Sequence, residues 1–440
     1  MTFLAEFDAA AGNPPAQVGV VIKWLRSNWP AMYAELRADR PILPTAAFTM
    51  VTRATDVLAV LAQPSLYSVR GNQRAMDPAV GPFMLARDET EINWEEKGLM
   101  RALLRWDDLP RVRALAGHVS AAAIANAVGK AGATGPRLDV VPTIARAVPL
   151  AIVQHIFGFA APSDDLLRWS FATQHGMFRN SPFSADVLAS CHKAGEEMRA
   201  WLKPFLAAKR AYAPSGGMDA VSRLIDISQA PAAGISPERV LSNVCGLLVG
   251  AIETSSQAIV QIIDQFLEHA DWREAALAAD AAGNIAAFDA YVFEALRFNP
   301  ITTIQFRFVE QDRVLGEGTT YATPVKAGTV LAVCTGSAMF DAALMPDPDR
   351  FDATRPANAY LHFGVGHHEC LGRYVGQVSI PEAVRQLLRQ PGLARAAHPA
   401  GAIDFAGGPF PEHLVVTWSG GATAAKHCMV TRTDTTESAA

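Results

Sequence analysis

The stretch HFGVGHHECLGRYVG, residues 362–376, decides how this chain is interpreted. Its first eleven positions hold three histidines, three glycines and one cysteine. Cys370 stands just before an expected helix, where unpaired backbone N–H groups and the helix dipole stabilise a thiolate. Gly364 and Gly366 permit a tight turn, and Gly372 leaves room beside the cysteine. The pattern is typical of a loop that presents one thiolate to a flat, bulky cofactor.

Other kinds of site fit this stretch poorly. A structural zinc site needs three or four converging ligands, but His367 and His368 are adjacent and point differently. A phosphate-binding loop needs lysine with serine or threonine after its glycines, and none follows here. The chain has no CxxC pair, and its remaining cysteines are scattered. We expect those cysteines to be buried small side chains or tail residues: Cys191, Cys245, Cys334 and Cys428.

The bulk composition indicates a large soluble protein. Half of the 440 residues are hydrophobic, and the formal net charge is −5 without any basic tract, so nucleic-acid binding is not expected. The N-terminus lacks a basic segment, which argues against a signal peptide. The most apolar stretch, 140–161, carries Arg146, Gln154 and His155, so no membrane span is expected. These features predict a cytoplasmic protein.

Helical periodicity dominates the chain, and strand-like segments are short. We expect helices near 18–38, 94–105, 109–129, 140–158, 163–178, 184–211, 236–268, 285–298 and 373–390. We expect strands near 305–310, 318–335 and 413–418. The sequence shows no repeat and no domain boundary. The predicted architecture is one mainly α domain with a small β region over residues 1–420, followed by a loose tail at 421–440.

The run Phe363–Gly372 resembles the cysteine-ligand signature of the cytochrome P-450 family. That signature is Phe-Gly-x-Gly-x-His-x-Cys-x-Gly, and every specified position matches. The resemblance implies a single large cytochrome P-450-type domain that binds haem b, iron protoporphyrin IX. It also implies that Cys370 is the metal ligand, and that Phe363, Gly364 and Gly372 contact the cofactor. The alternative is a buried structural cysteine in a glycine-rich turn.

Two further segments resemble structural motifs of the same family. FEALRFNP at 293–300 places Glu294 and Arg297 three residues apart on one helical face, where they can pair. MPDPDRFDATRP at 345–356 resembles the coil that follows, with Arg355 as the candidate third partner. The resemblance implies that these three residues hold the coil behind the cysteine loop.

The segment GAIETSS at 250–256 is similar to the family's oxygen-activation stretch, although Gly250 and Ala251 are exchanged relative to it. The resemblance implies that Glu253 and Thr254 are the catalytic pair that delivers protons. For Thr254 the alternative is a mid-helix threonine that bonds back to the preceding turn.

The family also holds the haem carboxylates with basic residues. In NWEEKGLMRALL, Lys97 falls where the family usually has histidine, and Arg101 lies one turn later. Arg307 and His368 complete the implied set. Lysine and arginine both bind carboxylates, so the substitution preserves anion binding. The alternative for each residue is a solvated surface position.

The resemblance implies a monooxygenase that inserts one atom of O2 into a hydrophobic small molecule. Electrons would come from a separate ferredoxin or flavodoxin with its reductase. The residues expected to line the substrate pocket, with plain core packing as the alternative for each, are Leu247, Leu248, Ala251, Ile301, Thr302, Ile304 and Phe410. One alternative is a peroxide-driven enzyme, a peroxygenase or a hydroperoxide isomerase or dehydratase, against which the Glu253–Thr254 pair argues. A second is a non-enzymatic haem sensor, for which no signalling domain is visible.

Overall fold

A computed structural model describes residues 1–419 except 89–90, 133–134, 181–182 and 213–216. The predicted tail at 421–440 and Cys428 therefore lie outside the described residues. The described chain is mainly helical, as predicted. Its α-helices are α1 (Phe3–Ala9), α2 (Pro14–Ser27), α3 (Trp29–Asp39), α4 (Ala54–Leu61), α5 (Gln73–Val80), α6 (Glu91–Leu103), α7 (Leu109–Gly129), α8 (Ala147–Ile152), α9 (Ser163–Gln174), α10 (Ala185–Tyr212), α11 (Ala220–Ser228), α12 (Pro237–Glu268), α13 (Ala270–Ala281), α14 (Ile285–Phe298), α15 (Thr335–Ala338) and α16 (Arg373–Leu388).

The strands are short and form three small sheets. They are β1 (Ile42–Pro44), β2 (Thr49–Val51), β3 (Tyr67–Ser68), β4 (Arg137–Asp139), β5 (Gln305–Val309), β6 (Arg313–Leu315), β7 (Thr323–Val325), β8 (Val330–Val333), β9 (Ala394–Arg395) and β10 (Val415–Thr417). The largest sheet has the order β1-β2-β8-β5-β3, in which only β2 and β8 are parallel. This sheet joins the N-terminal segment to residues far along the chain.

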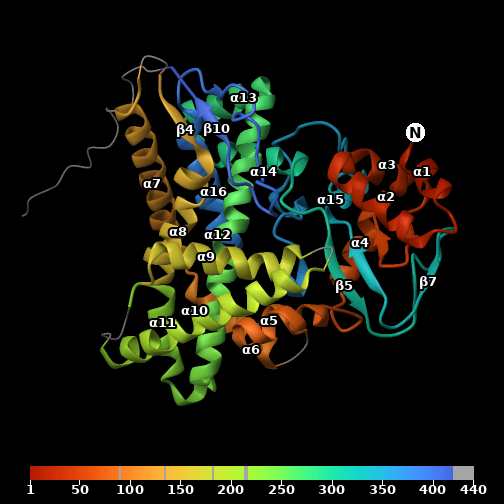
Figure 1. The fold of residues 1–440 in the computed structure, drawn as a ribbon, viewed down its shortest axis with the longest axis horizontal. Coiled ribbons are helices and arrows are strands. Elements are labelled where there is room, and N and C mark those ends of the chain that lie inside the picture. Colours follow the sequence, from red (N-terminus) through yellow and green to blue (C-terminus); the bar gives the residue numbers. More distant parts are fainter. Residues whose placement is uncertain (89–90, 133–134, 181–182, 213–216, 420–440) are drawn as a thin grey trace, which may run out of the picture.

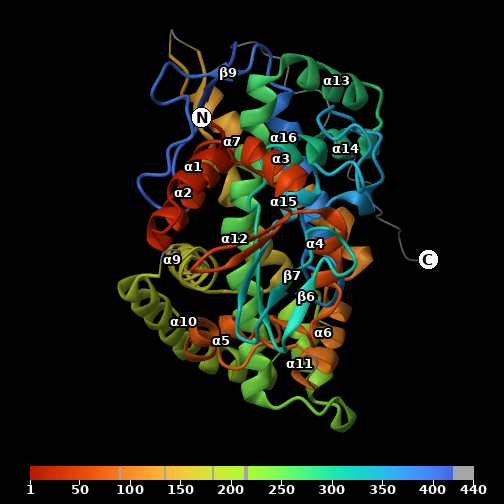
Figure 2. The same cartoon turned by 90° about the vertical axis from the view of Figure 1, so that its right-hand side faces the viewer.

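Helix α12 is the central element of the fold. It runs through the middle of the molecule, with α1 to α4 and the large sheet on one side and α7 and α8 on the other (Figure 1). The perpendicular view shows the same central position (Figure 2). Its predicted start is confirmed, because Ser236 accepts a hydrogen bond from the Arg239 N–H and Pro237 occupies the first turn. It is the one helix of the described residues long and apolar enough to cross a membrane, yet 78% of its apolar window is buried, as in a core helix.

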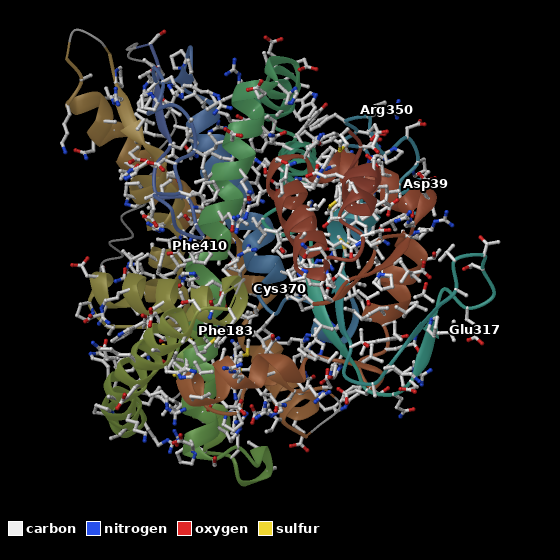
Figure 3. The ribbon with its side chains drawn as sticks, turned by 45° about the vertical axis from the view of Figure 1, so that its right-hand side comes forward. Asp39, Phe183, Glu317, Arg350, Cys370 and Phe410 are labelled. Carbon is white, nitrogen blue, oxygen red and sulfur yellow. The ribbon has the colours of Figure 1, made fainter. Side chains whose placement is uncertain are left out.

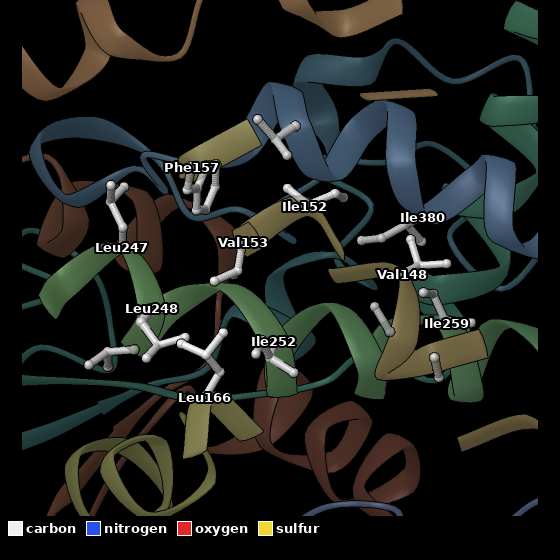
Figure 4. Close-up of a cluster of buried hydrophobic side chains, with 14 of the residues drawn as sticks. Val148, Ile152, Val153, Phe157, Leu166, Leu247, Leu248, Ile252, Ile259 and Ile380 are labelled. Atoms are coloured by element: carbon white, nitrogen blue, oxygen red, sulfur yellow. The ribbon is translucent and has the colours of Figure 1, made fainter. Parts of the chain in front are cut away.

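The main hydrophobic core forms around α12. Leu248, Ile252 and Ile259 on this helix point into a cluster with side chains of α8, α9 and α16, including Val148 and Leu166 (Figure 4). The side chains of this cluster are almost completely removed from water. Burial of such side chains stabilises the fold by about 1.5–3 kcal/mol each. This packing holds the middle of α12 rigidly.

Several predicted elements differ in the structure. The segment predicted as one helix at 18–38 is broken at Asn28 into α2 and α3, because Pro30 cannot continue the preceding helix. The predicted helix at 140–158 consists of α8 between two π-helical turns. The predicted strand at 318–335 is two strands, β7 and β8, separated by a turn at Gly328 with φ of 87°.

Candidate functional site

Cys370 lies between a short 3₁₀ turn, Gly366–His368, and the first residue of α16. Its backbone N–H donates to the Phe363 carbonyl oxygen at 2.8 Å, which closes the loop at residues 362–372. Desolvation by the surrounding loop atoms raises the pKa of the Cys370 thiol, although the residue keeps accessible surface, and the Gly372 N–H that donates to its sulfur lowers that pKa. The loop therefore holds the sulfur in place and offers it one donor that favours the thiolate.

The glycines of this loop are required by its backbone. Gly364 and Gly366 have φ values of 69° and 76°, in the left-handed region that other residues rarely adopt. A Cβ atom on Gly366 would also lie 3.2 Å from the Leu61 carbonyl oxygen. The tight turn predicted from the sequence is confirmed.

The middle of α12 has one accessible face, residues 250, 251 and 254, which we call the open face. Gly250 is exposed and Thr254 half-buried, although Val249 and Ile252 beside them are buried. A Cβ atom on Gly250 would meet no heavy atom within 4 Å. Cys370 is likewise exposed although it lies near the middle of the molecule (Figure 3). A bulky group can approach both places without displacing a side chain.

Two cations are buried near the Cys370 loop. Lys97 is 6% exposed, its Nζ donates to the His367 carbonyl oxygen, and burial lowers its pKa to about 8. Arg307 on β5 is also 6% exposed, and burial lowers its pKa to about 10. Its Nη1 donates to the Phe306 carbonyl oxygen at 2.8 Å, and within the described residues it has no carboxylate within 4 Å. Such cations are strained by burial and gain most from an acidic ligand.

The remaining predicted cofactor contacts lie beside these cations. The His368 ring Nε2 is 3.0 Å from a carboxylate oxygen of Asp88, and burial lowers the pKa of His368. Arg101 is more exposed, with Nη2 3.9 Å from Glu369. Lys97 and Arg307 thus lie beside the cysteine loop, His368 lies within it, and the more exposed Arg101 lies near Glu369 of the same loop. One thiol, accessible space and a set of cations fit a flat group with a metal at its centre and acids at its edge.

The predicted structural trio is present. Arg297 donates to both carboxylate oxygens of Glu294, at 2.6 and 2.9 Å, and both side chains are fully buried. Arg355 lies 3.4 Å from Glu294, so the expected third contact exists. The Tyr360 hydroxyl and the Asp352 N–H also donate to Glu294, at 2.8 and 2.9 Å. The cluster fastens the coil at 346–360 to α14, behind the cysteine loop.

Glu253 and Thr254 have very different surroundings. Glu253 is 1% exposed and pairs with Arg146 at 3.1 Å, and Arg146 also pairs with Glu412 at 2.7 Å. Burial raises the pKa of Glu253 and the Arg146 guanidinium opposes this rise. The Thr254 hydroxyl donates to the Gly250 carbonyl oxygen at 2.7 Å, which is the back-bonded geometry considered above. The hydroxyl donor is used by this bond, so the hydroxyl oxygen can take part in a further hydrogen bond only as an acceptor.

The residues predicted to line a pocket fall into two groups. Ala251, Ile301, Thr302 and Ile304 are half-buried. The others are almost completely enclosed: Leu247, Leu248 and Phe410. Leu247 and Leu248 belong to the core cluster (Figure 4), and Phe410 packs edge-on against Phe171 with 5.3 Å between ring centroids. Contact of all these residues with a substrate stays a prediction.

Sequence reasoning did not find several residues that complete the site: Asp88, Arg146, Tyr360 and Glu412. The ion pairs of Arg146 with Glu253 and Glu412 join residues 107 and 266 positions apart. No local spacing signals such contacts, so only the packed structure reveals them.

Comparison with known proteins gives a consistent result. The family model described as Cytochrome P-450 matches residues 170–390. The mycinamicin IV hydroxylase/epoxidase of Micromonospora griseorubida is 28% identical over 395 residues, covering 84% of this chain and 89% of that protein. The vitamin D(3) 25-hydroxylase of Pseudonocardia autotrophica is 28% identical over 380 residues, covering 83% and 87%.

Among solved structures, that of CalO2 superposes with a TM-score of 0.75 and 24% identity, covering 91% of this chain and 98% of its own. At this identity the likeness concerns the fold. The single mainly α domain predicted from the sequence is therefore confirmed as one known architecture.

Proposed function

The chain belongs to the cytochrome P-450 family and is a haem-thiolate monooxygenase, and from this premise we propose which of its residues carry each part of the reaction. In such a reaction one oxygen atom of O2 enters the substrate and the other leaves as water, with two electrons and two protons consumed. Haem bound through a thiolate supplies the O2 activation. The protein's own residues bind the haem and the substrate, orient them and deliver protons.

Cys370 is the proposed metal ligand, and its geometry is the observation that carries the proposal. The sulfur is accessible, accepts the Gly372 N–H, and lies in a loop closed by the hydrogen bond to Phe363. A donor to the sulfur tunes its charge and holds its orientation toward a metal. Within the described residues no group of three or more His, Cys, Asp or Glu side chains could hold a metal instead.

Lys97, Arg307 and His368, with the more exposed Arg101, are the proposed partners of the haem carboxylates. Two carboxylates are the acidic groups of haem b, which is the haem type we propose. Arg307 supports this assignment best, because a buried guanidinium without a carboxylate partner in the described chain gains a charge-assisted hydrogen bond from such a ligand.

Glu253 and Thr254 are the proposed proton carriers. A carboxyl group whose pKa is raised by burial can hold and release a proton closer to neutral pH than an exposed one. Arg146 fixes its position. Because the Thr254 hydroxyl donates to Gly250, we propose that its oxygen accepts a hydrogen bond from a water molecule on the open face, and that this water passes the proton on.

The substrate is proposed to be hydrophobic, bound by the apolar residues above the open face. Electrons are proposed to come from a separate ferredoxin or flavodoxin with its reductase. We also propose that residues 1–420 form the catalytic domain, and that the enzyme acts in the cytoplasm.

The test uses the haem-loaded enzyme. Lipids, terpenes and aromatic compounds are screened by Soret difference spectra, and the strongest binder is then supplied with ferredoxin, its reductase, reduced nicotinamide and isotopically labelled O2. We expect product only with reductant and O2 together, and label in the product. Oxygen-independent turnover, or turnover with a hydroperoxide alone at the same rate, would contradict the proposed reaction.

A further inference from the structure

Arg179 is a half-buried cation that the assignments above do not use. It is the last residue of a π-helical turn, His175–Arg179, that follows α9 directly. Its Nη2 donates to the Ile301 carbonyl oxygen at 2.6 Å and to the Gln257 side-chain oxygen at 3.1 Å. Its Nε is buried without a hydrogen-bond partner. No carboxylate within the described residues comes within 4 Å of this guanidinium, so its charge is uncompensated by them.

The position of Arg179 is on the substrate side. Gln257 follows Thr254 by three residues on α12, so both lie on one side of that helix. Ile301 begins the turn between α14 and β5, which is one of the segments proposed to contact the substrate. The guanidinium therefore connects the end of α9, the helix of the open face and the substrate turn. π-helical turns of this kind occur often at functional sites.

An apolar wall lies next to this cation. Phe171 and His175 precede Arg179 along the same segment, and their rings meet edge-on with centroids 6.1 Å apart. Phe171 also packs against Phe410. His175 and Arg179 are both half-buried, and burial lowers the pKa of each. The region combines aromatic surface with one fixed positive group.

The positive charge of Arg179 and its unpaired Nε–H indicate which chemical group would bind there. Both present partners of Arg179 are neutral oxygens, and enclosing a charge without an opposite charge is costly. Nη2 already donates to two oxygens, so the donor left for an acidic group is the charged Nε–H, which can form one charge-assisted hydrogen bond to a carboxylate. We propose that Arg179 binds a carboxylate group of the substrate, so that the substrate is an apolar molecule with one acid at its end. This inference rests on the proposed function, since it concerns the substrate side of the same site.

The experiment measures binding to the haem-loaded enzyme with dodecanoic, hexadecanoic and cholic acids and their methyl esters. Dissociation constants come from Soret shifts and, independently of the haem, from equilibrium dialysis of labelled ligand. We expect at least one acid to bind about tenfold or more tightly than its ester. Arg179→Gln should remove this preference, and Arg179→Lys, which keeps the charge, should retain part of it.

Arg168→Gln is the matched control. Arg168 lies on α9 and loses the same charge, but it is 51% exposed and already paired with Asp165 at 2.8 Å. The acid preference should survive this change. Equal affinity for every acid and ester in the unmodified enzyme, or a preference that Arg179→Gln leaves intact, overturns the inference.

Loss of haem in Arg179→Gln with retention in Arg179→Lys also overturns it, because Arg179 would then serve the cofactor. Failure of the proposed function gives a different result. The red-shifted Soret band of the reduced carbon monoxide complex would be absent, or turnover would not need O2, while the acid preference in dialysis could still be present.

Discussion

Polar groups are buried in two regions, the coil behind the cysteine loop and the side of α12 proposed to face the substrate. The two regions differ in how many of these groups have hydrogen-bond partners. Glu294 accepts hydrogen bonds from two arginines, a tyrosine and a backbone N–H, and Arg297 donates further to three backbone carbonyls. Near this side of α12, by contrast, Arg179 Nε and Gln261 Oε1 are buried without partners among the described residues.

The difference separates structural from ligand-binding polar groups. A buried group whose hydrogen bonds are all satisfied has nothing left for a ligand, and removing one member costs stability. A buried polar group that lacks a hydrogen-bond partner lowers the stability of the free protein, and a bound molecule can supply the missing partner. In this comparison, the fully paired Glu294–Arg297 cluster holds the coil to α14, and the unpaired Arg179 Nε lies where we propose that a ligand binds.

The largest effect on haem binding is expected at Cys370, the proposed metal ligand. Cys370→Ala removes the one sulfur that the loop presents, so haem should no longer bind through a thiolate. The red-shifted Soret band of the reduced carbon monoxide complex should disappear completely. Cys334→Ala, which changes a buried cysteine elsewhere, should keep it. Persistence of the band in Cys370→Ala would refute the ligand assignment.

The next effect concerns the fully paired cluster. Glu294→Ala leaves Arg297 buried without its counter-charge, which costs about 3–5 kcal/mol. We expect a lower midpoint in urea unfolding and poor haem retention. Glu294→Gln keeps the shape of the side chain and one acceptor oxygen. Its unfolding midpoint and haem retention should therefore lie between those of Glu294→Ala and the unmodified enzyme. A variant Glu294→Ala that is normally stable and merely turns over more slowly would show that the pair is not structural.

Thr254 tests the open face, where stability should hardly change. Thr254→Ala removes the hydroxyl proposed to hold the proton-carrying water, and general acid–base contributions are about 10²-fold or more. We expect reductant and O2 still to be consumed, with hydrogen peroxide formed in place of product. Thr254→Ser should stay coupled, and so should Ser255→Ala. Equal product per reductant in Thr254→Ala and the unmodified enzyme would exclude this role.

The smallest effect is expected for an exposed pair outside both regions. His413 Nδ1 lies 2.6 Å from an Asp139 carboxylate oxygen, and this hydrogen bond raises the pKa of His413. Since the folded-state pKa is raised, the stabilisation is complete below the unfolded-state value and is lost as pH rises through the folded-state value. Surface pairs contribute at most about 1 kcal/mol.

The measurement is thermal unfolding of the unmodified enzyme and His413→Gln at about pH 5.5 and about pH 8.5. At the lower pH the unmodified enzyme should unfold at a slightly higher temperature than His413→Gln. At the higher pH the two proteins should unfold at the same temperature. A difference that grows with pH would contradict the assignment.

The sequence by itself determined the features that depend on neighbouring residues. The cysteine loop needs left-handed glycines and a following helix, the start of α12 needs Ser236 and Pro237, and the Glu294–Arg297 pair needs only one helical turn. Local backbone geometry dictates each of these, so a short motif is sufficient to predict it.

The tertiary structure alone decided which distant charges meet and which stay unpaired. Arg146 reaches Glu253 across 107 positions, and Arg179 reaches Ile301 across 122. Such contacts depend on how helices pack around the core of α12, and many packings satisfy the same local patterns. Whether Thr254 bonds back to its own helix, and whether a buried arginine has a counter-charge, follows from that packing, because burial and pairing are properties of the surroundings and not of the residue.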